Sequence, residues 1–171
     1  MENELKFTYD GTGRKITGVS FYQIVSLARS IARKFEEDKI THVIGLARGG
    51  LIPATIISYK LNVPLLSYAI SSYDLADHPG EFEIYQSIDF NDLKHVVIDP
   101  HVLVVDDICD TGNTMHYICD KIELAGIKAK YATLVTKKKH RKFLDYYGVV
   151  VSNDIWVEFP WEIPEFEIPW K

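Results

Sequence analysis

The chain has 171 residues, 47% hydrophobic and 25% charged, a composition that is ordinary for one folded globular domain. Its formal net charge is −5, so we expect no general binding to nucleic acid or to an acidic membrane surface. No apolar run approaches the roughly 18 residues that span a bilayer, which argues against membrane insertion. The N-terminus lacks a secretory signal pattern, and Cys109 and Cys119 form neither a zinc pattern nor a disulfide framework. These features favour a cytoplasmic protein.

In chain order, the glycine-containing residues 1–18 predict a turn or a small hairpin. A helix is expected from Ser20, because Ser20 and Gln23 form a possible capping box and apolar residues recur at helical spacing up to Phe35. Strands and helices then alternate: strands over 41–46, 65–70, 101–105 and 131–136, and helices over about 51–61 and from about 115 to a cap at Gly126. This alternation predicts an α/β fold with a mostly parallel twisted sheet flanked by helices.

Two segments depart from this alternation. Residues 71–92 are expected to form a long loop, with six acidic residues and neither Lys nor Arg. Residues 160–171 hold three of the seven prolines and two of the three tryptophans. Because proline at that density forbids a continuous helix or a central strand, we expect an extended segment that wraps on the body or forms a subunit contact.

The most informative motif is HVLVVDDICDTGNTM, residues 101–115. An apolar run ends at the adjacent carboxylates Asp106 and Asp107, and a polar turn then leads into a helix. A loop that opens a helix presents free backbone N–H groups and a favourable dipole to a phosphate. Adjacent carboxylates accept hydrogen bonds in pairs, which suits the two hydroxyls of a ribose. The motif therefore predicts a ribose phosphate site.

Other interpretations of this motif fit less well. Asp110-Thr111-Gly112 resembles an aspartic protease tripeptide, but it opens a helix and the chain holds no second copy. An EF-hand loop would need polar ligands where Ile108 and Cys109 stand. A plain strand-turn-helix with solvated acids is the remaining alternative.

The segment VIGLARGG, residues 43–50, is the second strong motif. Glycines let the backbone approach an anion closely, and Arg48 adds a planar fork of donors beside Gly49. The alternative is a strand-to-helix turn in which glycine only shapes the chain.

The segment VLVVDDICDTGNT, residues 102–114, resembles the 5-phosphoribosyl-1-pyrophosphate (PRPP) motif of the type I phosphoribosyltransferases. The resemblance implies that Arg48 and Gly49 hold the pyrophosphate and that Asp106 and Asp107 lie on the ribose side. Asp107 would also face Mg2+, through water or directly, and Asp110 would act in catalysis by steering a proton of the base. The 5′-phosphate would lie in the loop formed by Asp110, Thr111, Gly112, Asn113 and Thr114.

The later segment DIWVEFPW, residues 154–161, and SSYD, residues 71–74, resemble the bacterial xanthine-guanine branch of this family. The resemblance implies a 6-oxopurine stacked on Trp156, with backbone groups of Val157 at the ring edge. Lys137 would face the exocyclic oxygen of the base, since an ammonium prefers a carbonyl to an amine. Trp161 is expected to fill the core.

The resemblance further implies a single domain over 1–171, with a core of about 20–140 and a small hood from 1–19 and 141–171. It also implies a purine salvage transferase that uses Mg2+, binds PRPP and a purine base, and forms a homodimer or homotetramer. The acidic segment 71–92 departs from the family, whose xanthine-guanine branch carries a basic residue there. One alternative is that Arg48, backbone and metal alone, or a basic group from a neighbouring subunit, hold the pyrophosphate. The other is that the chain is a regulatory protein that binds PRPP or nucleotide with little turnover.

Overall fold

The computed structural model describes residues 5–72 and 82–162 of the chain. A six-stranded sheet in the order β5-β4-β3-β6-β7-β8 forms its centre. Its strands are β3 (His42–Ala47), β4 (Leu65–Ser72), β5 (Phe82–Gln86), β6 (His101–Cys109), β7 (Lys128–Lys137) and β8 (Tyr146–Val151). The helices are α1 (Phe21–Lys34), α2 (Leu51–Leu61), α3 (Phe90–Val96) and α4 (Asn113–Leu124).

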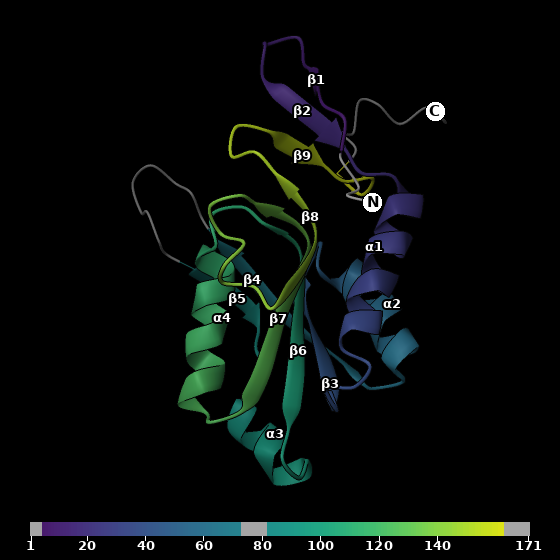
Figure 1. Cartoon of the computed structure of the whole chain (residues 1–171). Coiled ribbons are helices and arrows are strands. Elements are labelled where there is room, and N and C mark those ends of the chain that lie inside the picture. The colour runs from purple at the N-terminus through teal and green to yellow at the C-terminus, as the bar shows by residue number, and fades with distance from the viewer. Residues whose placement is uncertain (1–4, 73–81, 163–171) are drawn as a thin grey trace, which may run out of the picture.

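Every neighbouring pair in this sheet is parallel except β4 and β5. Helices α1 and α2 cover one face of the sheet and α4 covers the other, with α3 at the lower end in Figure 1. Alternate residues of β6 point into the two layers: Leu103 and Val105 join the cluster under α1 and α2, and Val102 and Val104 join the one under α4. Burial on both faces explains the unbroken apolar run and confirms the expected fold class.

Several expected elements are confirmed by the same local chemistry that predicted them. At the start of α1, Ser20 Oγ accepts a hydrogen bond from the Gln23 N–H, and Gln23 Oε1 accepts one from the Ser20 N–H. Helix α2 has the expected bounds. Gly126 follows α4 with a φ of +66°, a left-handed conformation that glycine adopts at little cost.

Other expectations were wrong in extent. Strand β6 does not end at the two carboxylates, because pairing with β7 continues to Cys109, opposite Thr136. The expected loop 71–92 contains the end of β4, all of β5 and the start of α3, and its residues 73–81 lie outside the described residues. Strand β8 had not been expected. It extends the central sheet beyond the proposed core boundary at residue 140.

A second, three-stranded sheet is built from segments near the two ends of the chain. Strands β1 (Thr8–Tyr9) and β2 (Lys15–Gly18) form the expected hairpin, and β2 pairs in parallel with β9 (Trp156–Glu158). This sheet stands above the carboxyl ends of β6 and β7 (Figure 1). It lies on the side where parallel sheets bind ligands.

Within the part of the chain that the structure describes, no helix combines the length and apolar character needed to cross a bilayer. The expected extended tail beyond Glu162 lies outside the described residues.

Candidate active site

A cleft of about 1210 Å³ opens at the carboxyl ends of β3 and β6. The two motifs meet there, since the parallel pairing of these neighbouring strands brings their ends to one edge of the sheet. Its lining includes Arg48, Gly49, Asp106, Asp107, Thr114, Tyr85, Trp161 and Glu162. The structure thus brings five of the sequence-predicted residues, from segments far apart in the chain, into one cavity.

The two carboxylates of this cleft are held by their own strand. Asp106 Oδ1 accepts a hydrogen bond from the Asp107 N–H at 3.0 Å, and Asp107 Oδ1 accepts one from the Ile108 N–H at 2.8 Å. Burial raises the pKa of Asp107, and burial together with the neighbouring charge of Asp107 raises the pKa of Asp106 well above its usual range. Such a pair attracts a cation or hydrogen-bond donors, because either would relieve the cost of the buried charge.

The Arg48-Gly49-Gly50 turn lies directly against these carboxylates. A Cβ on Gly49 would overlap the Asp107 carboxylate, and one on Gly50 would lie 2.6 Å from the Leu46 carbonyl oxygen and 2.7 Å from that of Val105. Glycine is therefore required at both positions by close approach. Arg48 itself is exposed at the cleft, and the Ala47–Arg48 peptide bond is cis.

The loop after β6 opens α4 as the sequence predicted. Gly112 precedes the helix with a φ of +80°, and the Asn113 N–H points to Thr111 Oγ1 at 3.4 Å. Thr111 and Asn113 are exposed, so backbone donors of the first helical turn are accessible to an anion. His116 from the first turn and His140 from the β7–β8 connection pack beside Gly112.

A buried lysine links the end of β7 to the segment that leads into β9. Lys137 is 4% exposed, and its Nζ donates a hydrogen bond to the Ile155 carbonyl oxygen. The same Nζ lies 3.7 Å from Asp110 Oδ1, and Asp110 is half-exposed. An ammonium has three donor positions, so Lys137 retains capacity for a further acceptor.

Trp156 and Val157 point to opposite sides of β9. Trp156 is 46% exposed, whereas Val157 is buried in the core with 6% exposure. Only the backbone of Val157 is therefore available to a ligand. The guanidinium carbon of Arg14 lies 4.6 Å from the centroid of the Trp156 ring.

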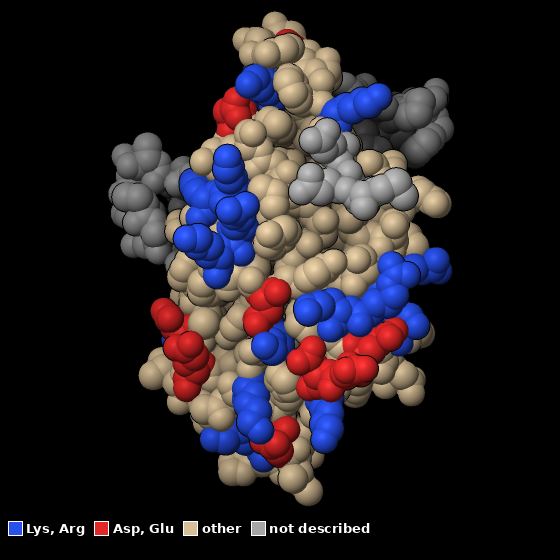
Figure 2. Space-filling view, in the orientation of Figure 1, with Lys and Arg blue, Asp and Glu red and all other residues tan. Residues whose placement is uncertain are grey.

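Exposed basic side chains surround the upper end of β7. Lys138, Lys139, Arg141 and Lys142 are all exposed. Figure 2 shows Lys and Arg side chains gathered on this face of the molecule near the β7–β8 connection. This patch would raise the local concentration of a polyanionic ligand.

Among the lining residues that sequence reasoning missed, two follow β9 in the chain. Trp161 does pack on the core, stacking on Phe159 with ring centroids 4.8 Å apart, but it also lines the cleft. A hydrogen bond from its side chain opposes the rise in the pKa of Asp107 that burial causes. Glu162 lies beside it, and burial raises the pKa of Glu162. No local pattern marks these residues, because their role depends on where the chain after β9 returns.

Comparison with known proteins agrees with this architecture. The chain matches the phosphoribosyl transferase domain family over residues 20–167. It is 30% identical to a xanthine-guanine phosphoribosyltransferase of Idiomarina loihiensis, over 85% of this chain and 86% of that protein. It is also 30% identical to one of Desulfotalea psychrophila, over 95% and 91%. The crystal structure of a purine phosphoribosyltransferase from Pyrococcus horikoshii aligns with a TM-score of 0.75 at 30% identity, covering 87% of this chain and 96% of that one. The chain therefore belongs to the phosphoribosyltransferase family, with the type I fold.

Proposed function

We propose that this protein is a purine phosphoribosyltransferase, which transfers the 5-phosphoribosyl group of PRPP to a 6-oxopurine and releases pyrophosphate. The observation that carries this proposal is the proximity of Lys137, Asp110 and the exposed Trp156 to the end of a sheet that also bears the carboxylate pair. The relatives named as xanthine-guanine and purine phosphoribosyltransferases support the same class of substrate.

On the PRPP side, the cleft supplies groups that match each part of the substrate. Arg48 and the backbone at Gly49 would hold the pyrophosphate, and Asp106 and Asp107 would accept hydrogen bonds from the ribose hydroxyls. The 5′-phosphate would lie on the loop that opens α4, with Thr111, Gly112, Asn113 and Thr114 around it.

The residues present fit a magnesium ion. Asp106 and Asp107 are oxygen donors, and their raised pKa values reflect a buried pair that a cation would stabilise. Among the described residues no group of three or more side chains could hold a metal alone, which agrees with an ion that takes most of its oxygen ligands from substrate and water. Asp107 would face the metal, and the ion would neutralise charge on the departing pyrophosphate.

On the base side, the proposal assigns three roles. Trp156 offers an indole face on which a purine stacks, and the backbone of Val157 meets the ring edge. Lys137 donates to the 6-oxo group. Since an ammonium has no acceptor, this contact disfavours an amino group at the same position.

The reaction follows from these positions. Purine N9 attacks C1 of the ribose as the C1–O bond to pyrophosphate breaks, and the bonding electron pair leaves with pyrophosphate. The proton released from the imidazole part of the base passes to Asp110, the catalytic residue of this proposal. The protein contributes orientation and charge stabilisation and forms no covalent intermediate.

A second function is a regulatory protein that binds PRPP or nucleotide on the same fold. The acidic segment 71–92 favours it, because it offers no Lys or Arg to the pyrophosphate. The named relatives are transferases, which disfavours it. A regulatory protein would gain melting temperature (Tm) with PRPP alone, and a base would change nothing further.

The proposal extends to the surroundings of the site. We propose one domain over 1–171, in which the three-stranded sheet acts as a hood over the cleft, and a homodimer or homotetramer as the working state. Both cysteines are free and buried, which suits a reducing compartment, and we propose the cytoplasm.

The test is product formation with PRPP and Mg2+ against guanine, xanthine, hypoxanthine, adenine, orotate and uracil. We expect a mononucleotide from a 6-oxopurine, lost in folded Lys137→Ala and Asp110→Ala variants. Turnover of orotate or uracil instead would contradict the proposed purine pocket. The absence of product with every base would instead favour the regulatory protein.

A further inference from the structure

The hairpin β1–β2 lies outside the matched family region, which begins at residue 20, yet it contacts the proposed base platform. Strand β2 pairs with β9 so that Ile16 lies opposite Trp156. Arg14 is two residues before Ile16, so its side chain leaves the sheet on the same face as that of Trp156. The Arg14 guanidinium lies 4.6 Å from the Trp156 ring centroid, within the range of a cation–π contact.

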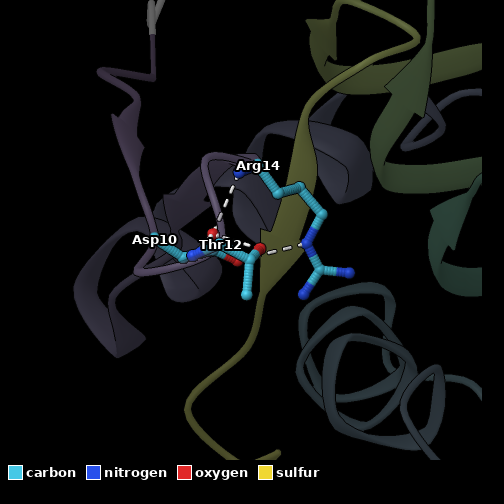
Figure 3. Close-up of polar contacts among 3 residues, drawn as sticks. All are labelled: Asp10, Thr12 and Arg14. Carbon is cyan, nitrogen blue, oxygen red and sulfur yellow. Dashed lines mark hydrogen bonds and ion pairs between the residues drawn. The ribbon is translucent and has the colours of Figure 1, made fainter.

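Asp10 fixes the position of Arg14. Asp10 Oδ1 accepts hydrogen bonds from Thr12 N–H at 2.8 Å, Thr12 Oγ1 at 2.7 Å and Arg14 N–H at 2.9 Å, and Oδ2 faces Arg14 Nε at 3.4 Å. Figure 3 shows the Arg14 side chain reaching from this turn across β9. The hydrogen bonds from Thr12 and Arg14 lower the pKa of Asp10 to about 2, so it is a carboxylate at neutral pH.

A second contact of the hairpin holds the same segment from the next residue. Lys15 Nζ donates to Asp154 Oδ2 at 2.7 Å. Lys15 and Arg14 point to opposite faces of the hairpin, so together they contact the chain just before Trp156 and at Trp156 itself. The hairpin therefore fixes the segment that carries the proposed base platform.

Among the described residues, no strand pairs with the other edge of β9. The Glu158 carbonyl accepts from the Val19 N–H, so the carbonyls of Trp156 and Glu158 point toward β2. Carbonyls alternate along a strand, and that of Ile155 therefore points away from β2, where Lys137 donates to it.

We propose that Arg14 is a positioning residue for the base: it stacks on one face of the Trp156 ring and holds the indole while the purine stacks on the opposite face. This inference rests on the proposed function, and it adds a contribution from an N-terminal hairpin outside the matched family region. Arg14 acts through Trp156 and has no role in PRPP binding or in proton transfer.

The test measures steady-state kinetics and nucleotide binding on the full chain. KM for guanine, KM for PRPP and kcat are compared in wild type, Arg14→Ala, Arg14→Lys and Asp10→Asn, with the dissociation constant (Kd) of guanosine 5′-monophosphate from calorimetry. Arg33→Ala, an exposed arginine at the far end of α1, is the matched control. Asp10→Asn keeps an oxygen for the turn but removes the acceptor that faces Arg14 Nε.

In Arg14→Ala we expect both KM for guanine and the nucleotide Kd to rise about 2- to 5-fold, the range of an exposed cation–π contact. KM for PRPP and kcat should not change. KM for guanine and the nucleotide Kd of Arg14→Lys should lie between those of wild type and Arg14→Ala, because lysine keeps the charge but lacks the planar guanidinium. Asp10→Asn should also raise KM for guanine and the nucleotide Kd.

A double variant separates positioning from a general effect on folding. In a Trp156→Ala background, Arg14→Ala should add nothing to KM for guanine, and an additive loss would overturn the inference. An unchanged KM and Kd in Arg14→Ala would also overturn it. A decrease in KM for guanine or in Kd would show that Arg14 occupies the place of the base, which contradicts the proposal.

The two proposals fail in different ways. If wild type turns over no 6-oxopurine but binds guanosine 5′-monophosphate, the proposed transfer is wrong, and the nucleotide Kd of the Arg14 variants still decides the inference. If wild type neither turns over guanine nor binds the nucleotide, both are wrong.

Discussion

The carboxylate cleft belongs to the six-stranded sheet, whereas the proposed base platform belongs to the three-stranded sheet. In the cleft, Gly49 leaves no room for a methyl group beside Asp107, and the strand beneath is buried on both faces. On the base side, Trp156 is 46% exposed and is held by side chains of a short hairpin. The difference indicates that the proposed PRPP side of the site tolerates little change, while the proposed base side can be altered without disturbing the main core.

The largest effect is expected from Asp110→Asn, which keeps the shape of the side chain but removes the proton acceptor. We expect kcat to fall by about 100-fold or more, the usual contribution of a general base, with a much smaller change in KM for PRPP. Asp120→Asn on the exposed face of α4 is the control. Retained kcat would assign the proton to another group and remove Asp110 from the chemistry.

Next, Gly49→Ala tests how rigid the cleft is. The added methyl group would overlap the Asp107 carboxylate, so the carboxylate or the turn must move. A displacement of about 1 Å in a reacting site costs on the order of 100-fold, and we expect such a loss in kcat/KM for PRPP. Gly11→Ala, which adds a methyl group in open space, should behave as wild type. Equal activity in Gly49→Ala and Gly11→Ala would show that the cleft accommodates the added methyl group without loss of function.

On the base side, Trp156→Ala should raise KM for the 6-oxopurine about 5- to 150-fold, which corresponds to the loss of one stacking contact. KM for PRPP and kcat at saturating base should hold, because the cleft is not touched. Trp156→Phe, which keeps an aromatic face, should lose less. If KM for the base stays at the wild-type value, the base lies elsewhere and the contrast between the two regions disappears.

The smallest effect is on stability and concerns Asp106→Asn. Because the folded pKa of Asp106 is raised above the unfolded value, the folded state binds more protons, and stability falls as pH rises through the interval between the two values. The carboxylate therefore destabilises the fold at neutral pH, and replacing it should raise Tm by about 2–4 °C at pH 7.5.

Calorimetry in EDTA would measure how the difference in Tm between Asp106→Asn and wild type changes with pH. The difference in Tm should vanish as pH falls below the ordinary aspartate pKa of about 3.9, where both the folded and unfolded carboxyl groups become protonated. The Asp107 N–H keeps an acceptor in the variant, since asparagine retains one oxygen. A lower Tm, or a difference that does not change with pH, would contradict this account of the carboxylate pair.

The helices and central strands were predictable where the signal is local. Ser20 and Gln23 form a cap within one turn, and the apolar run from Val102 to Val105 needs only burial on both faces. The extension of β6 was not predictable, because Asp106 and Asp107 are poor strand residues locally and only the facing strand β7 keeps them in the sheet.

Strand β8 was missed for a related reason. Gly148 interrupts its apolar run and weakens the local strand signal. In the structure a Cβ at Gly148 would lie 2.6 Å from the Leu134 carbonyl and 2.9 Å from Leu27 Cδ2, so close packing with β7 and α1 requires the glycine. Arg14 was missed as well, since its contact with Trp156 joins segments from near opposite ends of the chain.

The pairing of β2 with β9 also has a consequence for the order in which the protein is made. Residues 16–18 must wait for residues 156–158, so the three-stranded sheet cannot close until nearly all of the chain has left the ribosome. The strands and turns of the carboxylate cleft around β3 and β6 are synthesised well before that point. A ribosome stalled after α4 would therefore expose a nascent chain that carries the two carboxylates and the Arg48 turn but lacks the proposed base platform.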